Sequence, residues 1–147
     1  MGISDRNLPL RFVVHHLHPI SARLRFLKSS AEHVIYPEPL PARADLLDQC
    51  SRRPAMAIHP ASFLRKLCAT LSIAPQQLVI VNGFRLWIDT PDHVLPIYLV
   101  KVVSEQPFDA PKDFHWIELP DCCSLPQIER LVLRRIYDFS VGNEVFG

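Results

Sequence analysis

Hydrophobic and polar positions are patterned most clearly between Leu78 and Val103. Two apolar runs, 78–81 and 84–88, flank the dipeptide Asn82-Gly83. A type I′ turn needs positive φ at both central residues, and Asn and Gly tolerate it, so the dipeptide predicts a two-residue β-hairpin. The next run, 94–103, is almost continuously apolar and rich in β-branched residues, which predicts a central strand covered on both faces.

The other patterns predict two more strands and two helices. Residues 10–17 alternate between two faces of a strand, and the short run 114–119 has the length of an edge strand. Helical spacing of apolar residues predicts helices over 60–72 and 125–138. Strands and helices therefore mix along the chain without a βαβ repeat, as in an α+β protein.

The second helix has the clearest start signal. Ser124 and Gln127 have the spacing of a capping box, in which the serine hydroxyl and the glutamine side chain each bond a backbone amide at the helix start. Apolar residues spaced three and four apart predict the inner face of this helix, which consists of Ile128, Leu131, Val132 and Ile136.

Two segments before the first helix are less regular. Residues 20–31 have apolar residues at helical spacing, and an extended conformation over 22–27 remains an alternative. Prolines at 37, 39, 41 and 54 bracket a short helix candidate at 42–50, so the segment 31–58 is predicted to wrap the surface of the core.

Together these elements predict one α+β domain spanning residues 1–147. The sheet is expected to be mainly antiparallel, with the Asn-Gly hairpin at its centre and both helices packed on one face. A chain of 147 residues buries enough surface to form a core without disulfides or a structural metal.

The predicted hairpin has two different faces. In the register of a two-residue turn, one face is wholly apolar, and both helices are needed to cover it. The other face carries Leu78, Ile80, Arg85 and Trp87. An exposed patch of Trp and aliphatic residues with one Arg is typical of an interface centre, so we predict a protein partner or a homodimer with Trp87 as the anchor.

Charge and composition leave the partner open and bear mainly on location. The formal net charge of +1 provides no field that would favour nucleic acid or an anionic membrane. No apolar run is long enough to span a bilayer, and the amino end lacks the apolar region of a secretory signal. The four cysteines lack the spacing of a zinc or redox motif, which favours a reducing, cytoplasmic location, and no cofactor-binding motif is present.

Nucleic-acid binding stays open as an alternative, because arginines gather on the outer face of the predicted helix 125–138. These residues are Arg130, Arg134 and Arg135. The low net charge argues that the basic clusters are separate solvated faces, since a nucleic-acid surface normally shows a basic excess.

A small metal-dependent or thiol enzyme is the other alternative. If the first strand continues far enough, His16 and His18 project to one side, where two imidazoles are able to bind a divalent metal given a third ligand. Cys122 and Cys123 directly precede a helix, whose amino end lowers the pKa of a nearby thiol. A cysteine nucleophile also needs a base, for which His115 and His93 are the candidates.

No sequence motif identifies a reaction. Hydrolase, kinase, nucleotide-loop and dinucleotide signatures are all missing from the sequence. The predicted function is therefore a non-enzymatic interaction or assembly module rather than an enzyme.

Overall fold

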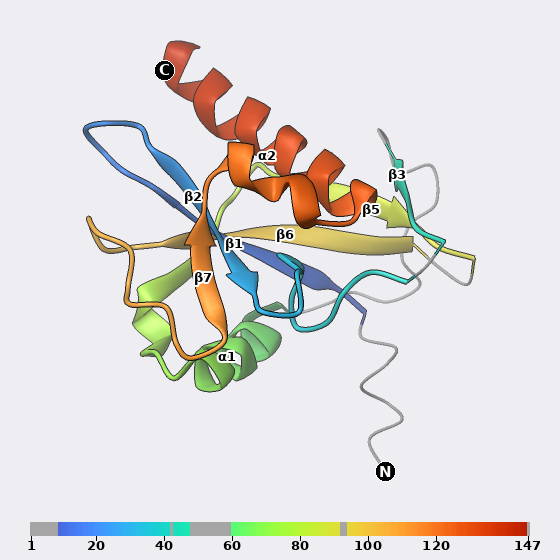
Figure 1. The fold of residues 1–147 in the computed structure, drawn as a ribbon, viewed down its shortest axis with the longest axis horizontal. Helices are drawn as coiled ribbons and strands as arrows, with labels where there is room; N and C mark the ends of the chain where they lie inside the picture. Colours follow the sequence, from blue (N-terminus) through green and yellow to red (C-terminus); the bar gives the residue numbers. More distant parts are fainter. Residues whose placement is uncertain (1–8, 42, 48–59, 92–93, 147) are drawn as a thin grey trace.

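The computed structural model describes residues 9–41, 43–47, 60–91 and 94–146, with side chains described up to residue 141. A mixed seven-stranded sheet is flanked by one helix on each face (Figure 1). Its strands are β1 (Arg11–Leu17), β2 (Leu24–Ser29), β3 (Asp45–Leu47), β4 (Leu78–Ile80), β5 (Leu86–Asp89), β6 (Val94–Val102) and β7 (Phe114–Ile117). The helices are α1 (Pro60–Leu71) and α2 (Gln127–Phe146), with short 3₁₀ turns η2 (Pro75–Gln77) and η3 (Leu119–Ser124).

The longest strand, β6, lies inside the sheet, as the apolar run 94–103 predicted. The strand order is β3-β5-β6-β1-β2-β7, and β4 also pairs with β6. Every residue of β6 is buried except Lys101, because the strand has neighbours on both edges and a helix against each face. The β1–β6 pair is parallel and the other pairs are antiparallel, so the expected mainly antiparallel sheet is in fact mixed.

The Asn82-Gly83 turn does not form the predicted hairpin. Strands β4 and β5 both pair antiparallel with the edge of β6 that β1 leaves open, and they do not pair with each other. Ile80 pairs with Val100 and Leu86 with Ile97, so the five residues 81–85 lie opposite only residues 98 and 99. The dipeptide is therefore the tip of a large bulge in one interrupted strand, and Gly83 supplies the positive φ of +89° that it needs.

The chain reverses after the bulge, between β5 and β6. Asp89 pairs with Val94, so the four-residue connection that the sequence predicted as a turn joins two paired antiparallel strands. Residues 92 and 93 lie outside the described part of the chain.

Helices α1 and α2 pack on opposite faces of the sheet, which corrects the prediction of one shared face. Successive strand residues point to opposite sides, so Phe12 faces α1 while Val13 faces α2. The α1 side also buries Leu64, Leu67, Cys68, Leu71, Tyr98, Val100 and Val102, and the α2 side buries Phe26, Ile97, Leu99, Val132, Leu133 and Ile136. Because β1 and β6 are apolar on both faces, each face requires a cover of its own.

The irregular first half of the chain is extended. Residues 24–29 form β2, so the extended alternative for the segment 20–31 is the correct one. In the proline-rich segment 31–58, the described part of the predicted helix 42–50 is the edge strand β3, and residues 42 and 48–59 lie outside the described part.

The inner face of α2 differs from the prediction by part of a turn. The buried residues are Glu129, Val132, Leu133 and Ile136, whereas Leu131 is 45% exposed. The Ser124 hydroxyl donates to Glu32 instead of capping the helix, and η3 forms the capping box at Glu118 and Asp121. No helix in the described residues is long and apolar enough to cross a membrane.

Candidate functional site

A tight turn after β2 brings polar side chains against the start of α2. The Glu32 amide donates to the Ser29 carbonyl at 3.0 Å, and the Ser29 amide donates to the His33 carbonyl at 2.8 Å. Glu32 itself adopts a φ of +65°, which is costly for a residue with a Cβ atom and persists only where surrounding contacts enforce it. This turn presents adjacent acidic and imidazole side chains to η3 and α2.

His33 is held by a buried carboxylate. Its Nδ1 lies 2.7 Å from Oε2 of Glu129, and the Val34 amide donates to Oε1 of the same carboxylate at 2.7 Å. Glu129 is 1% exposed and His33 is 27% exposed. Because an ionised carboxylate only accepts hydrogen bonds, Nδ1 donates this bond, and in the neutral form of the imidazole the lone pair is then on Nε2.

A second group of polar side chains surrounds Glu32. Its carboxylate accepts from Lys28 Nζ at 2.8 Å and from the Ser124 hydroxyl at 2.6 Å. The bonds from Lys28 and Ser124 lower the pKa of Glu32, and the charge of His115 adds to this effect. His115 on β7 lies directly opposite Lys28 on β2. We call these residues the His33 cluster: Lys28, Glu32, His33, His115, Ser124 and Glu129.

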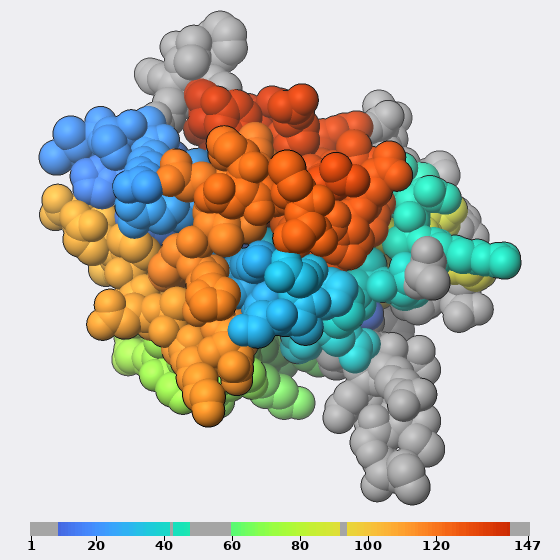
Figure 2. Space-filling model, viewed as in Figure 1, coloured from blue at the N-terminus to red at the C-terminus, as the bar shows by residue number. Residues whose placement is uncertain are grey.

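The His33 cluster is assembled from four parts of the fold. Figure 2 shows the light-blue surface of the β2 turn bordered by the orange surfaces of β7, η3 and α2. An imidazole oriented by a buried carboxylate, with its other nitrogen unprotonated, is the arrangement of a general base. The Ser124 hydroxyl donates to Glu32 rather than to His33, so the geometry favours a water molecule over this serine as the nucleophile.

The two histidines predicted as metal ligands are both bound to the backbone. His16 is buried, and its Nε2 donates to the carbonyls of Ser104 and Glu105 at 3.1 and 2.9 Å. His18 is half-buried, and its Nδ1 accepts from the amides of Ile20 and Ser21. Their ring centroids are 6.4 Å apart, and the described residues hold no group of three His, Cys, Asp or Glu side chains able to bind a metal ion.

The four residues of the predicted interface are not gathered on one exposed face. Leu78 is buried under α1, and Ile80 packs at the edge of the same core. Trp87 is half-buried between β3 and β6, where it pairs with Leu47 and Pro96. Arg85 is exposed, with its guanidinium 4.8 Å from the centre of the Tyr98 ring.

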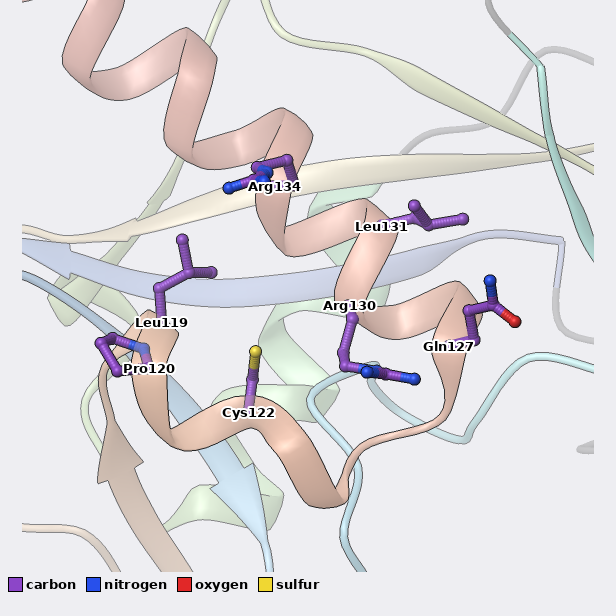
Figure 3. Close-up of a pocket in the computed structure, with 7 residues that line it drawn as sticks. All are labelled: Leu119, Pro120, Cys122, Gln127, Arg130, Leu131 and Arg134. Carbon is purple, nitrogen blue, oxygen red and sulfur yellow. The ribbon is translucent and has the colours of Figure 1, made fainter.

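The predicted basic and thiol residues separate into two groups. Arg130, Arg134 and Cys122 line a groove between η3 and α2, whereas Arg135 is exposed outside it (Figure 3). Cys123 is exposed, and its thiol contacts the Pro120 carbonyl at 3.8 Å. Within the described residues neither thiol is hydrogen-bonded to an imidazole, and His93 lies outside them.

Sequence analysis did not find the His33–Glu129 pair. Neither residue was singled out there as a site residue, and Glu129 lies within the predicted helix 125–138. The two residues are 96 positions apart. One signal was available, since a glutamate on the apolar face of an amphipathic helix must be paired when it is buried.

Comparison with known proteins gives a structural likeness only. No protein family model matches the sequence, and no curated protein matches it. The structure resembles a crystal structure of C. elegans Ap4A hydrolase, with a TM-score of 0.53 and 15% sequence identity over 87% of this chain and 93% of that one. This likeness supports an α+β fold that also occurs in an enzyme, and it contradicts the predicted non-enzymatic interaction or assembly module.

Proposed function

We propose that this protein is a hydrolase that cleaves phosphoanhydride bonds of nucleotides at the His33 cluster. The observation that carries the proposal is the hydrogen bond from His33 to the buried carboxylate of Glu129. A fold hosts many activities, so the likeness to a hydrolase only adds support, and the chemistry must be argued from the side chains.

In the proposed reaction, Nε2 of His33 takes a proton from a water molecule. The water oxygen forms a bond to phosphorus, the bridging phosphorus–oxygen bond breaks, and the proton passes to the departing phosphate. Glu129 keeps the imidazole in the correct tautomer and stabilises the positive charge that it acquires. Glu129 acts through His33, so it is a positioning residue.

A lysine and a second histidine beside Glu32 favour a phosphate substrate over a neutral one. Lys28 is 15% exposed and already bonded to Glu32, and His115 lies opposite it across the β2–β7 pair. An ammonium beside the reacting phosphorus would offset the negative charge that the phosphate oxygens carry. Glu32 competes for the same ammonium, so substrate binding is expected to lengthen the Lys28–Glu32 contact of 2.8 Å.

The test is hydrolysis of Ap4A, ATP and 4-nitrophenyl phosphate in the presence of Mg²⁺, which anhydride phosphates bind. We expect turnover of the two anhydrides and little of the monoester. His33→Gln should lower kcat by about 10²-fold or more with little change in KM, because Gln cannot accept the proton. Glu129→Gln should lower kcat by a smaller factor, since it removes the charge but retains an acceptor for Nδ1.

His18→Gln is the matched control, because this half-buried imidazole lies outside the His33 cluster and bonds local amides and the side chain of Gln106. It should leave turnover unchanged. Absence of hydrolysis for the whole panel would contradict the proposal. So would full activity in a folded His33→Gln variant.

A further inference from the structure

A groove between η3 and α2 shares no lining residue with the His33 cluster. It has a volume of about 530 Å³, within the usual range for a small-molecule site. Figure 3 shows α2 supplying one wall and η3 the other. The lining residues are Leu119, Pro120, Cys122, Gln127, Arg130, Leu131 and Arg134.

The α-helical period explains why the groove and the His33 cluster are separate. Residues 127, 130, 131 and 134 are spaced three and four apart and share one face of α2. Glu129 belongs to the opposite, buried face together with Val132, Leu133 and Ile136. A ligand in the groove therefore does not occupy the reaction centre proposed above.

The groove carries positive charge that no carboxylate in the described part of the chain neutralises. Within the described residues, no carboxylate lies within ion-pairing distance of Arg130 or Arg134. The acidic groups of η3 are engaged elsewhere, because Glu118 pairs with Arg23 and Asp121 accepts from the Glu118 amide. Two like charges four residues apart on a helix repel each other, and an anion between them would relieve this repulsion.

The rest of the groove is apolar. Its apolar lining consists of Leu119, Pro120 and Leu131, and Leu131 leaves 45% of its surface exposed. Gln127 adds an amide that donates and accepts hydrogen bonds. A pair of guanidinium groups suits the oxygens of a phosphate, and an apolar wall with one amide suits a flat, weakly polar group such as a nucleobase.

We propose that the groove between η3 and α2 is a second site that binds a nucleoside phosphate, with Arg130 and Arg134 on the phosphate and Leu131 against the nucleoside. The proposal does not require hydrolysis at the His33 cluster. A nucleotide bound in this groove would be a second ligand beside the substrate, or it would act as an effector.

Cys122 provides a local readout of occupancy. This half-exposed thiol lines the groove and Cys123 beside it does not, and Cys68 is buried. A protein with both Cys50→Ser and Cys123→Ser therefore reports alkylation at the groove. We expect ADP to slow iodoacetamide modification of Cys122 in a saturable manner, and inorganic phosphate or adenosine alone to protect it much less. Arg130→Gln and Arg134→Gln should each weaken protection by ADP about tenfold or more, the effect of losing one charge-assisted hydrogen bond.

Two controls separate this site from the reaction centre. His33→Gln should retain protection by ADP, and Arg65→Gln on the exposed face of α1 should behave as the parent protein. Failure of ADP to protect Cys122 would overturn the proposal, and so would protection that survives both arginine substitutions. Equal protection by inorganic phosphate would overturn the assignment to a nucleoside phosphate. If the protein hydrolyses the anhydrides but ADP does not protect Cys122, only this inference is refuted and the proposed function stands.

Discussion

Acid should destabilise the protein through His15, an imidazole buried in β1. His15 is 4% exposed, and its Nδ1 donates to the carbonyl of Val100 at 2.8 Å. Burial lowers the pKa of His15 from 6.5 to about 4, although the bond to Val100 acts in the other direction. The neighbouring charges of Lys101 and His16 lower it further.

The size and direction of the effect follow from the two pKa values of His15. The unfolded chain takes up a proton near pH 6.5 and the folded protein only near pH 4, so protons favour the unfolded state between these values. A difference of about 2.5 pKa units at about 1.4 kcal/mol each amounts to about 3 kcal/mol. This stability is fully present above pH 6.5 and is lost as the pH falls to about 4.

Urea unfolding between pH 7.5 and pH 4 measures this loss, and His15→Asn separates it from that of other titrating groups. The asparagine amide keeps a donor for the Val100 carbonyl but does not titrate. From neutral pH to pH 4, the free energy of unfolding of the native protein should fall by about 3 kcal/mol more than that of the variant. Parallel pH profiles for the two proteins would refute the reasoning, because His15 would then titrate alike in both states.

Three further predictions concern packing, backbone and the buried carboxylate, each read from the urea midpoint. Leu133→Ala should lower the free energy of unfolding by about 2–5 kcal/mol, because this side chain is buried. Leu131→Ala, at an exposed position, should lower it by under about 1 kcal/mol, and equal losses would mean that the faces of α2 are misassigned. Gly83→Val should cost about 1–3 kcal/mol from backbone strain alone, since an added Cβ meets nothing within 4 Å, and an unchanged midpoint would contradict the positive φ. Glu129→Ala should lower the free energy of unfolding by about 1–3 kcal/mol by leaving the Val34 amide buried without its acceptor, whereas a loss below about 0.5 kcal/mol would show that the carboxylate is not structurally engaged.

The local pattern of apolar residues was enough to predict those helices and strands whose surroundings are the same along their whole length. The run 94–103 is apolar at nearly every position, and most of it forms the buried strand β6. Helix α1 runs from residue 60 to 71, almost as its apolar stripe and opening proline indicate. The edge strand near 114–119 was also predictable, because short length and half-polar composition suit one open edge.

Features that depend on which segments meet were decided only by the tertiary structure. Asn82-Gly83 has the composition of a hairpin turn, but β6 offers a free edge long enough for both β4 and β5, so the dipeptide became a bulge. Two-sided burial of β1 and β6 placed the helices on opposite faces, and it turned α2 so that Leu133 rather than Leu131 is buried. The pairing of His33 with Glu129 has the same origin: the sequence places a histidine in a turn and a glutamate on a helix, and only the packing of α2 against the end of β2 brings them within 2.7 Å.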